Sequence, residues 1–143
     1  MNAMASITLP AELRVRRVRL ATGPAAPAEA RSQVRTAIRN WEVPVDSYVA
    51  ALLTSELVTN AIRHETGETV TVDISCSRDQ LRVDVHDTSA AAPAPVDVPA
   101  DAETGRGLTL VAILGDEWGF YPTLWGKAVY FTLAFQPGFP LDG

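Results

Sequence analysis

The segment that most constrains the fold is an apolar helix that carries a carboxylate and an amide. The sequence predicts this helix from Val45 to Arg63. At about 100° per residue, Glu56 and Asn60 share one stripe of the helix, and apolar residues line the opposite side as well. A helix that is apolar around most of its circumference must be covered on several sides. This helix is therefore largely buried.

Glu56 and Asn60 are four residues apart, so a helix directs both side chains to the same place. Buried polar groups are costly unless they have partners, and a hydrated metal ion bound to a phosphate would satisfy both. The structural alternative is that Glu56 pairs with an arginine, such as Arg31 or Arg35, while Asn60 bonds to a backbone group. Taken alone, the helix favours this structural alternative.

The strand predicted from Leu81 to Asp87 ends its apolar row with a carboxylate. Period-2 alternation places the apolar residues and Asp87 on one face. Such a carboxylate either caps the turn into Thr88 and Ser89, which is the commoner use, or accepts a hydrogen bond from a molecule bound in a pocket.

A glycine-flanked helix start follows at Glu103–Leu108. Gly105 and Gly107 allow close approach of the backbone to a ligand, and the first N–H groups of the helix predicted from Gly107 to Leu114 suit a phosphate. Arg106 adds a cation. A pair of glycines is weak evidence by itself, because most such pairs only form turns.

The order of the elements predicts one α+β domain over residues 1–143. We expect a two-layer α/β sandwich, in which a mostly antiparallel mixed sheet is covered on one face by helices. Residues 1–12 and 137–143 are expected to be flexible. The remaining predicted elements are a helix at Pro27–Trp41 and strands at Val15–Leu20, Thr69–Cys76, Trp118–Tyr121 and Val129–Phe135.

Four motifs in this order resemble the GHKL ATPase and kinase superfamily, and within it the anti-sigma-factor serine kinase branch. The matching segments are Glu56–Ala61 for the N box, Asp87–Ser89 for the first glycine box, Gly105–Leu108 for the second, and Gly126–Lys127 for the turn before the last strand. The resemblance covers nearly the whole chain.

The resemblance implies that ATP and Mg²⁺ are the cofactors and gives each motif a role. Asn60 would bind Mg²⁺, Glu56 would be the catalytic general base, and Asp87 would accept the adenine amino group. The second glycine box would bind the nucleotide and hold its triphosphate, through Gly105, Arg106, Gly107 and Leu108. Residues 90–104 would form the mobile ATP lid.

The implied function is an anti-sigma-factor-like regulator with serine protein kinase activity. Its partners would be a sigma factor and an antagonist protein that carries the phosphorylated serine, and the regulator itself would form a homodimer. The alternative is a non-catalytic, protein-binding regulator with weak or no nucleotide binding. Two departures favour it: residues 89–93 lack the usual glycines, and Ala128 replaces a threonine that supports adenine through water.

The composition restricts the cellular compartment and the classes of partner that we expect for this protein. A net charge of −5 and a pI near 4.9 argue against a nucleic-acid groove. A single cysteine, Cys76, excludes an internal disulfide and fits a reducing compartment. Neither a membrane-spanning run nor a signal pattern is present, so we expect a cytoplasmic protein without direct nucleic-acid or membrane contacts.

Overall fold

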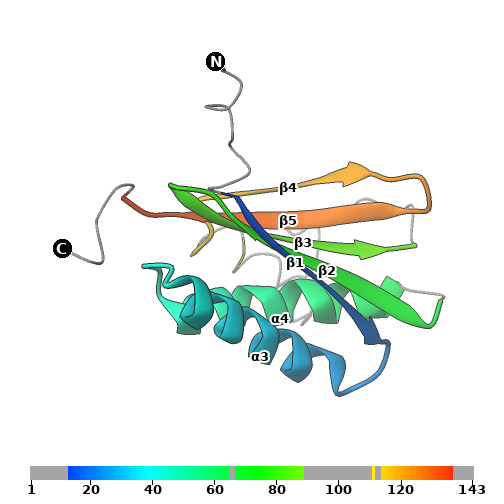
Figure 1. Ribbon diagram of the computed structural model, residues 1–143. Coiled ribbons are helices and arrows are strands. Elements are labelled where there is room, and N and C mark those ends of the chain that lie inside the picture. Colours follow the sequence, from blue (N-terminus) through cyan, green and yellow to red (C-terminus); the bar gives the residue numbers. More distant parts are fainter. Residues whose placement is uncertain (1–12, 65–66, 89–110, 112–113, 137–143) are drawn as a thin grey trace, which may run out of the picture.

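The computed structural model describes residues 13–64, 67–88, 111 and 114–136. They form two layers, a five-stranded sheet and a pair of helices that lie against one of its faces (Figure 1). The predicted α+β sandwich is thus confirmed. Its elements are β1 (Arg14–Ala21), α3 (Ala26–Trp41), α4 (Ser47–His64), β2 (Thr69–Cys76), β3 (Gln80–Asp87), β4 (Glu117–Pro122) and β5 (Lys127–Ala134).

The sheet has the strand order β1-β2-β3-β5-β4, and all four pairings between these strands are antiparallel. The β4–β5 hairpin joins the sheet through β5, which pairs with β3 along its whole length, from Gln80 opposite Ala134 to Asp87 opposite Lys127. The ends of β3 and β5 are therefore held side by side.

The core fills the space between the sheet and the helices. Alternation along each strand turns one row of apolar side chains toward the helices. The expected core row of β5 is confirmed, because Val129, Phe131 and Leu133 are buried. On α4, Leu53, Leu57 and Val58 are almost fully buried, as expected for a helix that is apolar around most of its circumference.

The start of α4 and the end of α3 are each defined by local backbone structure. Asp46 caps α4, since its carboxylate accepts hydrogen bonds from the backbone N–H groups of Tyr48 and Val49 at 2.9 and 3.2 Å. α3 ends at Glu42, whose left-handed backbone (φ 55°, ψ 48°) turns the chain toward α4. Among the described residues, neither helix is long and apolar enough to cross a membrane.

Several predicted features lie outside the described residues. They include most of the helix predicted from Gly107 to Leu114, the lid at residues 90–104 and the two ends of the chain. Within that helix, Val111 and Leu114 are described and are helical, and the Val111 side chain is fully buried.

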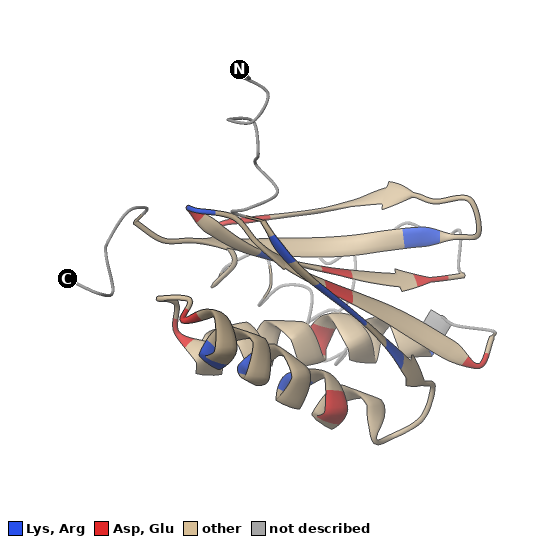
Figure 2. Cartoon of the chain, viewed as in Figure 1, with Lys and Arg blue, Asp and Glu red and all other residues tan. Residues whose placement is uncertain are grey.

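The sheet face opposite the helices carries a polar network. Arg17 donates two hydrogen bonds to the Asp73 carboxylate, at 2.7 and 2.8 Å, and His86 lies 3.1 Å from the same carboxylate. These contacts join β1, β2 and β3. Figure 2 shows basic residues, coloured blue, along the length of β1.

A second group on this face joins β3, β4 and β5. Arg82 donates to both oxygens of Asp84, and its guanidinium lies over the Tyr130 ring at 3.9 Å from the centroid. The Tyr121 hydroxyl donates to Asp84 at 2.9 Å, and burial together with this bond raises the pKa of Tyr121 to about 12.

The Arg17–Asp73 pair makes stability depend on acid pH. Hydrogen bonding by Arg17, assisted by His86, holds the pKa of Asp73 below its ordinary value of 3.8. Asp73 therefore stabilises the folded state above pH 3.8 and loses this effect as pH falls through its lowered folded-state pKa. We expect Asp73→Asn to lower the thermal midpoint at pH 7, and the difference from wild type to shrink steadily below pH 4.

Thermal unfolding followed by circular dichroism between pH 2 and pH 7 measures this difference. Glu117→Gln, at an exposed position of β4, is the control. A gap between wild type and Asp73→Asn that stays constant down to pH 2 would contradict the assignment.

Candidate functional site

Three buried polar side chains come from three elements and face the layer between sheet and helices. They are Asn60 on α4, Asp87 at the end of β3 and Lys127 at the start of β5. Counted over the whole residue, backbone included, their exposed fractions are 4, 5 and 3%. The other buried polar groups on α4, Thr54 and Ser55, donate to carbonyl oxygens of their own helix. Asp87 and Lys127, in contrast, bond to each other across two strands.

The topology places these three residues at one end of the molecule. α4 ends at His64, one turn after Asn60, and the chain re-enters the sheet at Thr69. In the next strand, His86 lies opposite Thr71, so the last residue of β3 lies beside the start of β2. α4 packs against both β3 and β5. The end of the helix and the ends of these strands thus frame a single region.

Asn60 has an unfulfilled hydrogen-bond acceptor. Its side-chain Oδ1 is buried and has no hydrogen-bond partner among the described residues, so this oxygen does not accept a bond from their backbone N–H groups. An unpartnered amide oxygen in the core is destabilising. Amide oxygens are suitable ligands for Mg²⁺, so Asn60 fits the magnesium-binding role that the sequence predicted.

Glu56 lies one turn before Asn60 and is partly buried. It lines a hollow of about 300 Å³ together with Arg31 and Arg35 of α3 and Tyr48 of α4. The carboxylate is therefore at an accessible surface between the two helices. The two arginines named in the structural alternative border the same hollow.

Asp87 forms a buried ion pair with Lys127. The lysine Nζ lies 3.1 Å from Oδ1 and 3.0 Å from Oδ2, and the two side chains are 4% (Lys127) and 0% (Asp87) exposed. Sequence reasoning placed Asp87 at this site and missed Lys127. The signal was present, because alternation puts Lys127 in the same core-facing row as Val129 and Phe131.

Gly126 fixes the turn that delivers Lys127. A Cβ atom at this position would collide with the carbonyl oxygen of Asp87 and the backbone of Thr88. The turn is closed by Thr123, whose N–H donates to the Gly126 carbonyl and whose hydroxyl accepts from the Gly126 N–H. Only glycine allows this approach between the turn and the end of β3.

Ala128 lies on the other side of the sheet from Asp87. It is fully buried on the face away from the helices, opposite His86 on β3 and Tyr121 on β4. A threonine hydroxyl at this position would therefore point away from the Asp87 carboxylate. The expectation that Ala128 removes an adenine contact is corrected by this geometry, since Lys127 occupies the helix-facing position.

The remaining predicted site residues, Gly105, Arg106, Gly107 and Leu108, lie outside the described residues. Within the part of the chain that is described, no cluster of three or more histidine, cysteine or acidic side chains is suited to hold a metal ion. Asn60 is the metal-binding candidate that the described geometry supports.

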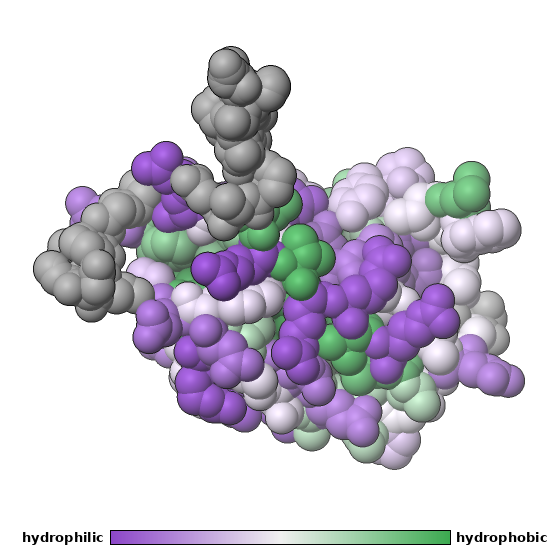
Figure 3. Space-filling model, in the orientation of Figure 1, coloured by the Kyte–Doolittle hydropathy of each residue, from purple (hydrophilic) through white to green (hydrophobic). Residues whose placement is uncertain are grey.

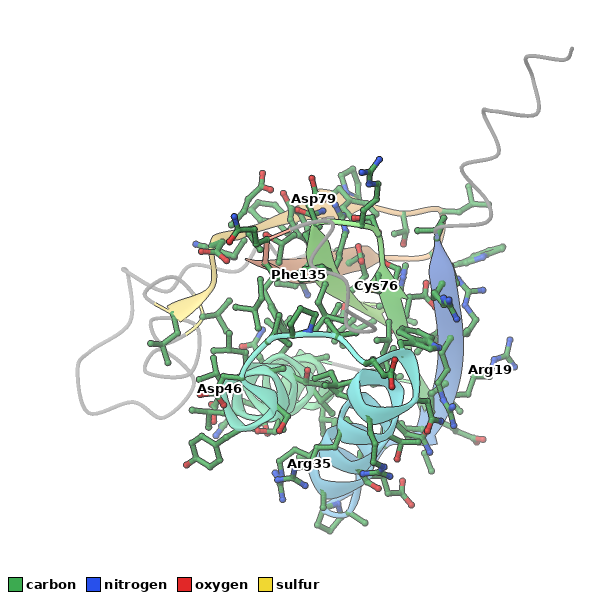
Figure 4. All side chains as sticks on the ribbon, turned by 60° about the vertical axis from the view of Figure 1, so that its left-hand side comes forward. Arg19, Arg35, Asp46, Cys76, Asp79 and Phe135 are labelled. Atoms are coloured by element: carbon green, nitrogen blue, oxygen red, sulfur yellow. The ribbon has the colours of Figure 1, made fainter. Side chains whose placement is uncertain are left out.

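A second hollow, of about 420 Å³, lies at the end of the open sheet face. Arg17, Arg19, His86 and Trp125 are among its lining residues. Figure 4 shows Arg19 extending outward from β1, away from the helices, and Figure 3 shows hydrophilic side chains covering much of the face around β1 and α3. Trp125 is 79% exposed here.

The sequence matches a known family over most of its length. Residues 12–132 match the family described as the histidine kinase-like ATPase domain, so the chain belongs to this family. The predicted superfamily is confirmed. A search of the curated proteins gives no match.

Solved structures include one with the same fold. In the crystal structure of the RsbU and RsbW domains of Rv1364c from Mycobacterium tuberculosis, the superposed part has a TM-score of 0.63 and 18% sequence identity. The match covers 87% of the present chain and 33% of the solved one, so this chain spans about a third of that protein's length.

Proposed function

We propose that this protein binds Mg²⁺–ATP and transfers the terminal phosphate to a serine of an antagonist protein, thereby regulating a sigma factor. The observation that carries the proposal is the buried, unpartnered Oδ1 of Asn60, one helical turn after Glu56. Membership of the histidine kinase-like ATPase family supports ATP as the nucleotide. The shared fold with a structure that contains an RsbW domain supports the anti-sigma type of regulator.

Each side chain has a distinct task in this proposal. Mg²⁺ supplies charge neutralisation to the phosphates, and the Asn60 amide oxygen holds it. Glu56 accepts the proton from the serine hydroxyl, which makes that oxygen a better nucleophile. Asp87 accepts a hydrogen bond from the exocyclic amine of adenine, and its burial makes a mismatched base costly.

The first test is nucleotide selectivity. Because a buried carboxylate accepts from the adenine amino group and is mispaired with the guanine carbonyl, the wild type should bind ATP and bind GTP poorly. Asp87→Asn should weaken ATP by roughly 1–3 kcal/mol. Isothermal titration in the presence of Mg²⁺ measures both, and circular dichroism checks that the variant is folded. Equal affinities of the wild type for ATP and GTP would refute the role of Asp87.

A second candidate function is a regulator that only binds proteins. The hollow on the open sheet face favours it, since Arg19 and Trp125 are exposed there and are available to a partner. This candidate predicts that Mg²⁺–ATP binds weakly or not at all, so the same titration separates the two functions.

A further inference from the structure

We propose that Lys127 reads the nucleobase together with Asp87, as a hydrogen-bond donor placed beside the acceptor. This inference rests on the proposed function, because it assigns a second base-contacting residue beside Asp87. It also explains why a charged side chain occupies the first position of an otherwise apolar, helix-facing row of β5.

Lys127 is the only lysine of the sequence, and the other eleven of its twelve Lys and Arg residues are arginines. Arginine thus fills the other Lys/Arg positions of this chain, while the compact ammonium group of lysine lies at a position more buried than that of any described arginine. A buried ammonium is costly unless its donors are used. The position therefore selects for a small cation with several donors.

The ion pair leaves one donor of the Lys127 ammonium unused among the described residues. Two hydrogen bonds of the ammonium go to Asp87, and no partner for its third N–H is present among the described residues. Lys127 thus holds this donor beside the Asp87 carboxylate, with Nζ 3.0 Å from Oδ2.

Adenine offers the complementary pair on one edge. Its exocyclic amine is a donor, and the adjacent ring nitrogen N1 is an acceptor. With the amine bonded to Asp87, N1 faces the neighbouring ammonium, which can donate its third N–H to it. A purely structural pair would neutralise Asp87 without any dependence on N1 of the ligand.

Deleting the acceptor from the ligand tests this contact without changing the protein. The probes are ATP and 1-deaza-ATP, in which N1 is replaced by C–H, titrated calorimetrically with Mg²⁺. We expect wild type to bind 1-deaza-ATP roughly 10- to 100-fold more weakly than ATP, as for loss of a hydrogen bond to a charged group. Lys127→Met, which removes the donor and keeps the side-chain length, should bind both ligands with the same, weakened affinity.

The single lysine provides an independent readout. In protein labelled with ¹³C only at lysine, the side-chain signal belongs to Lys127 alone. ATP should shift this signal, and saturating 1-deaza-ATP should shift it less.

The outcomes separate this inference from the proposed function. If wild type binds ATP and 1-deaza-ATP equally well, the nucleotide function stands and Lys127 is only the counter-ion of Asp87. If Lys127→Met binds ATP more tightly than wild type, Lys127 masks Asp87, and the inference is again wrong. Absence of ATP binding to the wild type overturns both. Should Lys127→Met fail to fold, the comparison of the two ligands on the wild type decides.

Discussion

Glu56→Ala is expected to lower phosphate transfer by about a hundredfold or more while leaving ATP affinity within a few-fold of wild type. A general base acts on the attacking hydroxyl and has little contact with the nucleotide in the ground state, so its loss affects turnover more than binding. Partner binding should survive as well. The measurement is transfer of label from γ-labelled ATP to the serine-bearing antagonist, together with nucleotide titration of the same protein.

Two further variants distinguish loss of the general base from loss of nucleotide binding. Glu56→Gln keeps the shape and hydrogen-bonding capacity of the side chain and removes its basicity, so it should be as inactive as Glu56→Ala. Asn60→Ala should lose both Mg²⁺–ATP affinity and transfer, because Oδ1 of Asn60 is the proposed metal ligand. Transfer by Glu56→Ala at the wild-type rate would make Glu56 a structural carboxylate and the mechanism wrong.

Gly126→Ala should destabilise the fold by roughly 2–4 kcal/mol. The new methyl group would meet backbone atoms of Asp87 and Thr88, which cannot move aside as a flexible side chain does. Relief of this clash must displace either the end of β3 or the start of β5. Nucleotide binding should therefore fall even at temperatures where the variant is folded. Urea unfolding measures the free energy, and titration with ATP measures the second effect.

Gly23→Ala is the matched control, because an added Cβ at Gly23 has no heavy atom within 4 Å. Its free energy of unfolding should stay within about 0.5 kcal/mol of wild type. A Gly126→Ala variant as stable as Gly23→Ala would mean that the turn can shift freely, and that Asp87 and Lys127 are not held in fixed positions by it.

The sequence predicted the strands and the two long helices because the hydrophobic pattern of each is strong. Period-2 alternation in β3 and β5 gave the correct buried rows, and the apolar surface of α4 gave its position in the core. The burial of Asn60 followed from the same reasoning. Local patterns of this kind need no knowledge of which elements become neighbours.

Pairing across the sheet was harder to predict, because it depends on register. The contact of Lys127 with Asp87 requires that β5 lie next to β3, with these two residues opposite one another. The same register places Ala128 on the opposite face of the sheet from the Asp87 and Lys127 side chains. Trp125 is exposed although large aromatic residues are usually buried, because it lies in the turn between β4 and β5.

Because the chain has a single lysine, digestion with a lysine-specific protease can report opening of the sheet. A lysine-specific protease has one cleavage site in these 143 residues, and that bond lies at the start of β5, between β3 and β4 in the sheet. Cleavage there requires β5 to detach from both neighbours, which amounts to opening of the sheet's interior. When reclosing is faster than cleavage, the digestion rate follows the equilibrium population of that open state. Every nick then records one such opening event, and two fragments divided after Lys127 are its only products.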